Sequence, residues 1–358
     1  MNNPIISVCI PVFSTEAYLA QCLRSVYTQD FDSFEVVVVS DASRGKDEKG
    51  RTAKKIVKLA QKESDKFRKE KNLPRVLFRF IEHKENRGLI EVRRSLCYEA
   101  RGFYMTQCDS DDEMEAGALT ALYKAAFIED EPKNALNDGE SQNQHEDTNF
   151  FDIVHGTSTA GTFDESGNFT PAQDNRYGKI FYGKIEGHDV FRRWLLNGDF
   201  TANTWGKLIK RELWVKAYEN IPYTECNMAD DVLLFFFLGQ YAQSYIGIET
   251  KVYRYRVNTG MTSHRKIDTM HKWKMICSTA SVFSVISTWI ESQSALSEDE
   301  VNKIRGMTRY YLANNIRQMN EVVVPELKEK ARSMLCEYWG TGFVEKMEAA
   351  LRAREQPN

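Results

Sequence analysis

Short apolar runs alternate with amphipathic stretches over the first 110 residues. The runs at residues 5–10 and 34–40 are typical of strands buried on both faces of a parallel sheet, and further strands are predicted at 75–82 and, as a short apolar run, at 103–108. The segments between them, including 52–69 and 89–101, are predicted to be helices, and Ser14 or Thr15 is expected to cap the first one. Strands that alternate with helices in this way predict a right-handed parallel α/β sheet.

The rest of the chain predicts more of this sheet, followed by a helical region. The polar, acidic segment 129–149 lacks periodicity and is interpreted as a mobile surface insertion. The further predicted elements are strands at 151–163, 168–173 and 250–257, helices near 187–197 and 210–218, and a strongly apolar helix that starts at Asp230. From about residue 268 the pattern is helical to the end. We therefore expect one α/β domain over residues 1–265 and a helical region over residues 266–358.

The sequence DSDD, residues 109–112, directly follows the fourth predicted strand. Carboxylates gathered at one strand end repel one another unless a positive charge lies there, and hard divalent cations take oxygen ligands. On an extended segment, Asp109 and Asp111 point to one side and Asp112 to the other. A metal site is one interpretation. The other is an acidic loop or a helix start, with Glu113 and Glu115 in the first turn.

Composition and charge narrow the class of protein. The 358 residues carry a net charge of −3 with a pI near 6.2, which argues against a general nucleic-acid binder. The seven cysteines form no CxxC pair, as expected for free thiols in a reducing compartment. There is no basic, apolar leader and no apolar stretch of 18 residues. We therefore expect a cytoplasmic protein, and peripheral contact with the inner face of the membrane stays open.

Five segments, in the right order, resemble inverting glycosyltransferases of family two. They are PIISVCIPVF…VVVVSDAS (residues 4–43), NRGLIEVRR…QCDSDD (86–112), TWGKLIKRELW (204–214), NMADDVLLF (227–235) and KVYRYRVNTGMTSH (251–264). The order of the segments makes the resemblance specific, because a single motif is weak outside its structural context. It implies a GT-A fold, with a mostly parallel sheet, helices on both faces and a helical C-terminal region.

The resemblance implies a nucleotide-sugar site at the carboxyl ends of the first strands. Its residues would be Pro11, Phe13, Asp41, Arg93 and Asp109, with Asp41 accepting a hydrogen bond from the imide of a uracil base. Mn²⁺ or Mg²⁺ would be held by Asp111 and Asp109, with His264 as a further contact. Each residue also has a structural interpretation: Asp41 as a turn residue after a strand, and Arg93 as part of an exposed helix face. For the neighbouring Arg94 we favour the exposed face.

The resemblance also implies a catalytic pair, Asp230 and Asp231, at the start of the apolar helix. The second residue would be the base that removes the proton of the acceptor hydroxyl. The alternative is that the pair only caps the helix, whose dipole favours anions. Trp205 and Lys207 would lie on the acceptor side. Trp205 would stack on a sugar ring or pack in the core, and we favour packing with partial exposure.

The sequence therefore predicts a metal-dependent inverting glycosyltransferase that uses a nucleotide sugar, UDP-linked by resemblance, and a hydroxyl acceptor on a glycan or lipid-linked molecule. The setting expected by resemblance is bacterial surface polysaccharide or glycan synthesis. A homo-oligomer through the helical C-terminal region is a further expectation. Two alternatives remain. One is a degenerate GT-A scaffold that binds a partner, and the other is a sugar-nucleotide nucleotidyltransferase, although residues 11–18 lack the glycine- and arginine-rich loop of that class.

Overall fold

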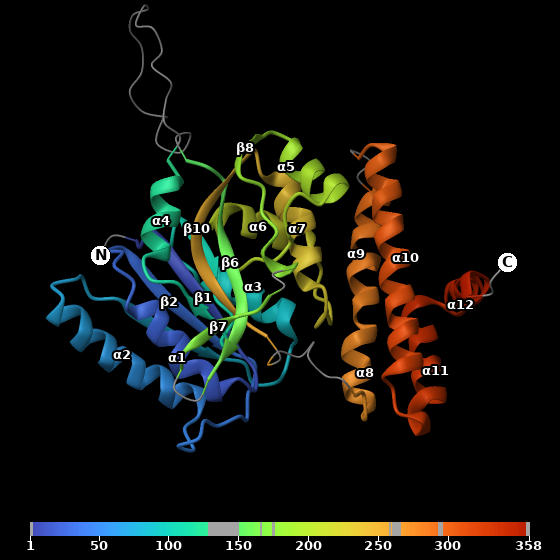
Figure 1. Cartoon of the computed structure of the whole chain (residues 1–358), viewed down its shortest axis with the longest axis horizontal. Helices are drawn as coiled ribbons and strands as arrows, with labels where there is room; N and C mark the ends of the chain where they lie inside the picture. The colour runs from blue at the N-terminus through green and yellow to red at the C-terminus, as the bar shows by residue number, and fades with distance from the viewer. Residues whose placement is uncertain are drawn as a thin grey trace, which may run out of the picture.

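The computed structural model describes residues 3–127, 150–164, 167–173, 176–257, 259, 266–292 and 296–355. An α/β domain, blue to yellow in Figure 1, lies beside a group of helices formed by the C-terminal residues, orange to red. The predicted insertion at 129–149 and His264 lie outside the described residues.

The first four strands of the sheet are parallel, as predicted. They are β1 (Ile6–Val12), β2 (Phe34–Ser40), β3 (Leu77–Glu82) and β4 (Tyr104–Gln107), in the order β3-β2-β1-β4. Helices α1 (Glu16–Tyr27), α2 (Ala53–Glu70) and α3 (Leu89–Glu99) connect them. Because the strands are parallel, the residues that follow β1, β2 and β4 meet at one edge of the sheet.

The remaining strands make the sheet mixed. Strand β9 (Lys207–Lys210) is antiparallel to both β4 and β6 (Ile153–Phe163), and β10 (Ser244–Arg256) runs parallel to β6. Three short strands complete it: β5 (Glu113–Met114) and β8 (Gly183–Glu186) pair with β10, and β7 (Phe169–Pro171) pairs with β6. Strands β5, β8 and β9, only two to four residues long, were not predicted, because so few residues carry no periodicity.

The helix start proposed for Glu113 and Glu115 is wrong. Glu113 lies in β5, opposite Arg254 of β10, and the guanidinium of Arg254 lies 2.6 Å from the carboxylate of Glu115. The helix that follows, α4 (Ala118–Ala125), begins only after Gly117. The strand ladder and the cross-strand ion pair therefore take the place of the predicted first helical turn.

The two faces of the sheet pack against different sets of helices. In β2, Val36 and Val38 belong to the core that contains apolar residues of α1, α2 and α4. Val37 and Val39 belong to the other core, which contains α3 and the helices α5 (Asp189–Arg192), α6 (Arg211–Asn220) and α7 (Asp230–Tyr241). The alternation follows from the two-residue period of a strand. The prediction of a mostly parallel α/β sheet covered on both faces is confirmed.

The described C-terminal residues form five α-helices, as the helical pattern from residue 268 predicted: α8 (Met270–Cys277), α9 (Thr279–Ser292), α10 (Glu298–Glu321), α11 (Lys328–Trp339) and α12 (Thr341–Glu355), with a short 3-10 helix (Pro325–Leu327) before α11. Residues Phe283 and Ile286 of α9 and Ile304 of α10 belong to the same core as α7. A separate apolar cluster, centred on Trp273, joins α8 to α10, α11 and α12. The helical region is therefore packed directly on the α/β domain. Among the described helices, none combines the length and apolar character that a bilayer span requires.

Candidate active site

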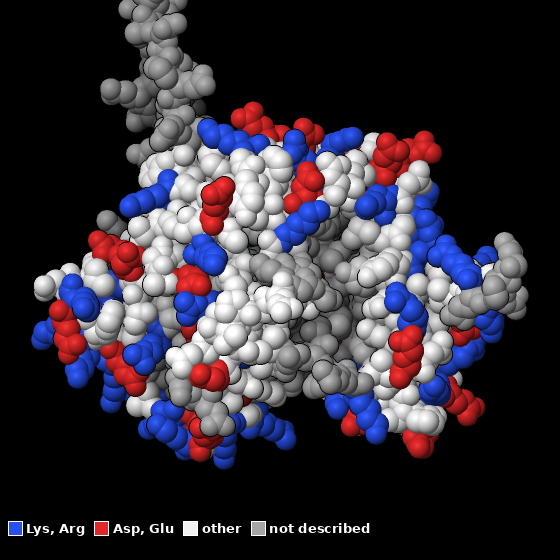
Figure 2. All heavy atoms as spheres, in the orientation of Figure 1, with Lys and Arg blue, Asp and Glu red and all other residues white. Residues whose placement is uncertain are grey.

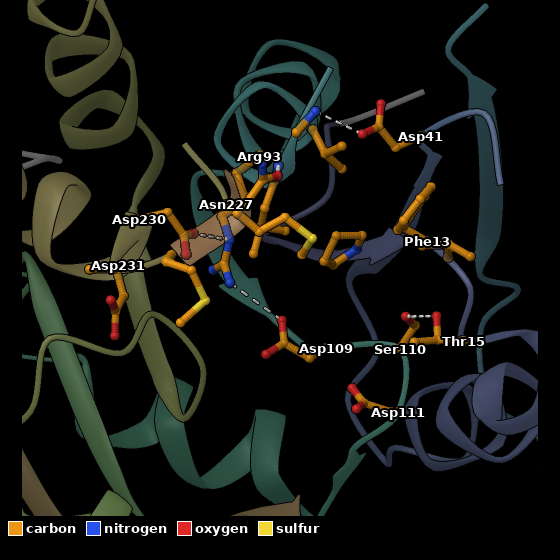
Figure 3. A pocket seen from close by; sticks show the side chains of 18 of the residues that line it. Phe13, Thr15, Asp41, Arg93, Asp109, Ser110, Asp111, Asn227, Asp230 and Asp231 are labelled. Atoms are coloured by element: carbon orange, nitrogen blue, oxygen red, sulfur yellow. Dashed lines mark hydrogen bonds and ion pairs between the residues drawn. The ribbon is translucent and has the colours of Figure 1, made fainter. Parts of the chain in front are cut away.

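A cavity of about 300 Å³ lies at the carboxyl ends of β1, β2 and β4. Figure 3 shows Asp41 and Phe13 on one side of it, Asp230 and Asp231 on the other, and Asp109 between them. The predicted site residues that line it are Pro11, Phe13, Asp41, Arg93, Asp109, Asp111, Trp205, Asp230 and Asp231. Residues more than 200 positions apart in sequence thus share one cavity, and this clustering is what a common active site requires.

The DSDD turn is held from behind by strand β10. The hydroxyl of Tyr253 donates to Asp112 Oδ2 at 2.8 Å and accepts from the Asp109 amide at 3.0 Å. The Arg256 amide donates to Asp112 Oδ1 at 2.7 Å, and its guanidinium donates to the Asp111 carbonyl at 2.7 Å. Asp112 is buried, whereas Asp109 and Asp111 line the cavity. The predicted division of the three carboxylates is confirmed.

The turn is also tied to the start of α1. Thr15 occupies the N-cap position of α1, but its side chain accepts no hydrogen bond from the helix. Its hydroxyl lies instead 2.6 Å from the hydroxyl of Ser110. The predicted capping role of Thr15 is therefore wrong, because a contact between the two loops uses the same oxygen.

The electrostatics of Asp109 and Asp111 suit a divalent cation. Burial raises the pKa of Asp109 to about 6; Arg93 opposes this shift, and the charge of Asp111 adds to it. Burial also raises the pKa of Asp111, although the Thr259 hydroxyl donates to its carboxylate at 3.0 Å. Within the described ranges, no group of three or more potential side-chain ligands gathers. The donor set is thus two carboxylates, and phosphate oxygens and water would have to complete the shell of Mg²⁺ or Mn²⁺.

Asp41 organises the loop after β3. Its two carboxylate oxygens accept hydrogen bonds from the amides of Arg87 and Gly88 at 2.9 to 3.1 Å. His83 Nδ1 lies 2.7 Å from Oδ1. Asp41 is almost fully buried at the cavity wall. Asp41 therefore holds a loop distant in sequence rather than the local turn proposed for it, and contact with a nucleobase stays a prediction.

Arg93 lies between the two groups of carboxylates. Its Nε is 2.9 Å from Asp230 Oδ2 and its Nη2 is 3.5 Å from Asp109 Oδ1, as Figure 3 shows. Its Nη1 donates to Gln107 at 3.1 Å and to the hydroxyl of Thr204. Arg93 is buried, so the exposed-face interpretation is wrong for it. The side chain joins β4, the 201–205 loop and the start of α7 around the cavity.

The exposed face expected of Arg94 is also wrong. Its guanidinium donates to the carbonyls of Tyr218, Ile221 and Pro222 and pairs with Glu91. These contacts join α3 to the end of α6. Arg94 has a structural role here, away from the cavity.

The two aspartates of α7 lie in different environments. Asp230 is buried and paired with Arg93. Asp231 accepts a hydrogen bond from the Val232 amide at 2.9 Å and is more exposed. Burial, together with the charge of Asp230, raises the pKa of Asp231 to about 6, against the opposing effects of Arg93 and Lys207. Among the described residues, Asp231 thus has no direct cation partner, and its pKa suits it to accept a proton near neutral pH.

The two predicted acceptor-side residues differ in position. Trp205 lines the cavity, and its ring stacks on Tyr253 and Tyr255 at centroid distances of 4.8 and 5.4 Å. It is only 7% exposed, which agrees with the packing interpretation. Lys207 is fully buried and does not appear among the cavity-lining residues. A direct acceptor contact by Lys207 does not fit this position.

Residues 7–136 match the sequence profile of glycosyl transferase family 2. This region of the chain is similar in sequence to family 2 glycosyltransferases. The match includes β1 from Ser7 onward, β2 to β4, α1 to α3 and the DSDD turn. It covers Asp41, Arg93, Asp109 and Asp111 at the cavity, while Asp230 and Asp231 lie outside it.

Relatives extend the similarity to glycosyltransferases over most of the chain. Glycosyltransferase GlyA of Streptococcus pneumoniae is 26% identical over 258 residues, which are 72% of this chain and 31% of GlyA. Glycosyltransferase GlyG of the same organism is 25% identical over 271 residues, 74% of this chain and 75% of GlyG. The chain therefore spans less than a third of GlyA but most of GlyG.

Solved structures are similar at a lower level. Residues 1–349 of TarS from S. aureus, in complex with UDP-GlcNAc, align with 99% of this chain and 93% of that one, at 16% identity and a TM-score of 0.47. At this score, the fold assignment rests on the strand order and pairing described above. That order is a mostly parallel α/β sheet followed by helices, the GT-A arrangement expected of a family 2 glycosyltransferase.

Several cavity residues were not predicted from the sequence. Asn203 and Thr204 reach the cavity from the loop before β9, Asn227 from the loop before α7, and His271 and Lys274 from α8. His271 and Lys274 are three residues apart and share a helix face, but nothing in the sequence says what that face meets. The basic residues of α8 therefore join the site only through the packing of the helical region on the α/β domain.

Proposed function

We propose that this protein transfers a glycosyl group from a nucleotide sugar to a hydroxyl group of an acceptor, with inversion at the anomeric carbon. The observation that carries the proposal is the single cavity that joins Asp109 and Asp111 at the end of β4 to Asp231 at the start of α7. One side offers oxygen ligands and the other offers a base. Two carboxylate groups with separate tasks are what a single displacement at a sugar carbon needs.

The donor is proposed to bind along the first strands. Pro11 lies near the end of β1, Phe13 directly follows β1, and Asp41 follows β2. All three residues line the cavity. Phe13 is 40% exposed and presents an aromatic face to a planar base. We propose a UDP-linked sugar, with the imide of uracil directed at the Asp41 side. The choice of uracil rests on the sequence resemblance alone. The geometry of Asp41 adds no support for it, because both of its carboxylate oxygens already accept hydrogen bonds from backbone amides.

A divalent cation, Mn²⁺ or Mg²⁺, is proposed to be held by Asp111 and Asp109. When bound, it would neutralise the charge that develops on the departing nucleoside diphosphate. Arg93 adds a fixed positive charge beside Asp109. The Tyr253 and Arg256 contacts hold the turn that presents both carboxylates, so the chain supplies a preformed anionic turn for the cation.

Asp231 is the proposed base. The acceptor oxygen attacks the anomeric carbon as the bond from that carbon to the diphosphate oxygen breaks, and the hydroxyl proton passes to Asp231. Attack opposite the leaving group inverts the configuration in one step, so the chain needs no nucleophile. Asp230 is held by Arg93 at 2.9 Å, which favours Asp231 over Asp230 for this task.

The acceptor and the setting are part of the proposal. The acceptor would be a glycan or a lipid-linked molecule in bacterial surface polysaccharide or glycan synthesis, in the cytoplasm and in peripheral contact with the membrane. The family 2 match and the two pneumococcal relatives support the class of reaction. Charges of both signs are interspersed over the described part of the face in Figure 2, which fits a sugar substrate better than a nucleic acid.

The test is calorimetric titration with UDP, GDP, CDP and ADP, each with and without Mn²⁺. We expect one diphosphate to bind in a metal-dependent way, and the corresponding nucleotide sugars then to release that diphosphate when an acceptor is supplied. Failure of every diphosphate to bind would contradict the proposed transferase and favour a scaffold. Release of pyrophosphate from a nucleoside triphosphate and a sugar phosphate would instead identify a nucleotidyltransferase.

A further inference from the structure

A lysine side chain is buried directly behind the wall of the cavity. Lys207, the first residue of β9, is fully buried. Its Nζ donates to the carbonyl oxygens of Thr201 at 3.0 Å and Asn203 at 2.5 Å. Within the described part of the chain, the hydrogen-bond partners of this ammonium group are these carbonyls rather than a carboxylate. A buried cation paired only with dipoles is costly, so its place in the fold calls for an explanation.

The two carbonyls belong to the loop that lines the cavity. Asn203, Thr204 and Trp205 all reach the cavity, and the Asn203 amide donates to the Trp205 carbonyl at 2.8 Å. The Thr204 hydroxyl accepts a hydrogen bond from Arg93. Lys207 therefore fixes a loop that in turn holds the arginine between Asp109 and Asp230.

The same ammonium group lies beside the helix that carries Asp231. Its Nζ is 5.6 Å from the ring centre of Phe235 in α7. Phe235 follows Asp231 by four residues, so both side chains lie on one face of that helix. The ammonium group of Lys207 is thus buried on the side of Asp231 that faces away from the cavity. Without solvent between them, the attraction between the ammonium group and the carboxylate is strong.

We propose that Lys207 is a positioning residue: its buried ammonium ion fixes the 201–205 loop against the cavity and holds a positive charge behind the Asp231 carboxylate. This inference rests on the proposed role of Asp231 and goes beyond it. The charge favours the ionised form of Asp231, which is the form that accepts a proton. Lys207 itself touches no substrate.

The titration of the two groups agrees with this geometry. Burial lowers the pKa of Lys207 to about 7, and the charge of Asp231 opposes that shift. In return, Lys207 lowers the pKa of Asp231, which burial and Asp230 raise to about 6. Among the described residues, the other titratable or charged groups that interact with Asp231 or Lys207 include Arg93, Asp109, Asp230, His155, Cys226 and Tyr311.

The test follows Asp231 directly and needs no substrate. The protein is labelled with ¹³C at the aspartate carboxyl carbons, and the Asp231 signal is identified by its loss in Asp231→Asn. We expect Lys207→Met to raise the pKa of Asp231 by about one unit or more, and Lys207→Arg to restore most of the wild-type value. An unchanged Asp231 titration in folded Lys207→Met would overturn the proposal.

A reciprocal measurement covers the case in which Lys207→Met does not fold. In Asp231→Asn, the ammonium signal of Lys207 should titrate below its wild-type pKa of about 7, because coupling between two sites is mutual. An unchanged Lys207 titration in that variant would also overturn the proposal. Since neither experiment uses a donor or an acceptor, each result stands even where the proposed sugar transfer fails its own test.

Discussion

Arg93 and Asp230 form a buried ion pair, with Nε of Arg93 2.9 Å from Oδ2 of Asp230. The two atoms are close but have no hydrogen-bond alignment, so the pair is held mainly by charge. The same guanidinium lies 3.5 Å from Asp109. One cation therefore balances carboxylates of both halves of the cavity. In the part of the chain that the structure describes, this arrangement leaves Asp231 without a direct cation partner.

Replacing Arg93 should destabilise the protein. We expect Arg93→Met to lower the free energy of unfolding by about 3 to 5 kcal/mol, because it leaves buried carboxylates without their cation. The measurement is urea unfolding at pH 7.5. Arg75→Met is the matched control, since Arg75 pairs with Asp65 at the exposed surface, where an ion pair adds little to stability. Equal losses in both variants would contradict the balancing role of Arg93.

Replacing Asp111 should remove metal-dependent nucleotide binding. Asp111→Asn keeps the shape of the side chain but lacks the charge that a divalent cation needs, so we expect the Mn²⁺-dependent part of the diphosphate affinity to be lost. Asp112→Asn is the matched control, because Asp112 faces β10 rather than the cavity. Calorimetry that found metal-dependent binding intact in Asp111→Asn would remove its assigned role.

Metal binding should weaken in acid. The carboxylates of Asp109 and Asp111 must be ionised to bind a cation, and the pKa of Asp109 is raised to about 6. Protons therefore compete with the metal as the pH falls through 6. Titrations of Mn²⁺ with the bound diphosphate at pH 5.0 and 7.5 should show much weaker binding at the lower pH. Equal affinity at both values would show that neither carboxylate is a ligand.

Replacing Asp231 should stop transfer without preventing donor binding. We expect Asp231→Asn to lower kcat by roughly 10²- to 10⁴-fold, the usual contribution of a general base, with an unchanged diphosphate affinity. In the wild type, kcat should fall as the pH drops below about 6, where Asp231 becomes protonated. Near-normal transfer by Asp231→Asn, with Asp230→Asn inactive, would assign the base to Asp230 instead.

The Asp231→Asn variant should be more stable than the wild type at neutral pH. The folded-state pKa of Asp231, about 6, lies above the unfolded value of about 4. The folded state therefore binds the proton more tightly, and stability is lost as the pH rises from about 4 through 6. Asp231→Asn should escape this loss and gain about 1 to 2 kcal/mol at pH 7.5, with little gain at pH 4. Thermal unfolding of the variant and the wild type at pH 4 and pH 7.5 measures this gain. An equal difference in stability at the two pH values would refute the raised pKa of Asp231.

Removing one hydroxyl should loosen the DSDD turn. Tyr253→Phe leaves the Asp109 amide and the Asp112 carboxylate without their shared partner, at an expected cost of about 1 to 3 kcal/mol. Tyr255→Phe, two residues further along β10, is the control, because its ring also stacks on Trp205. Urea unfolding should show a larger loss for Tyr253→Phe, and the reverse order would contradict this account of the turn.

The sequence by itself determined the parallel half of the sheet and the edge of that sheet at which the cavity lies. Strands β1 and β2 are largely apolar and buried, β3 and β4 carry polar residues such as Arg79 and Gln107, and the residue that follows a parallel strand must lie at one known edge of the sheet. The strand pattern alone therefore brings Asp41, Asp109 and Asp111 to the same edge. The opposite directions of Asp111 and Asp112 were predicted for extended backbone, but residues 109–112 form a turn in which the Asp112 amide donates to the Asp109 carbonyl at 3.0 Å, so the contacts of Asp112 with β10 decide its direction.

Only the tertiary structure decided how the other elements meet this edge. Strands β5 and β9 are too short for a periodicity, and their pairing with β10, β4 and β6 depends on contacts between residues distant in sequence. The burial of Lys207, the position of Arg93 between Asp109 and Asp230, and the α8 residues at the cavity follow from that packing. Side-chain pattern encodes which face of an element is buried, but the partner of that face is set by the packing of the whole chain.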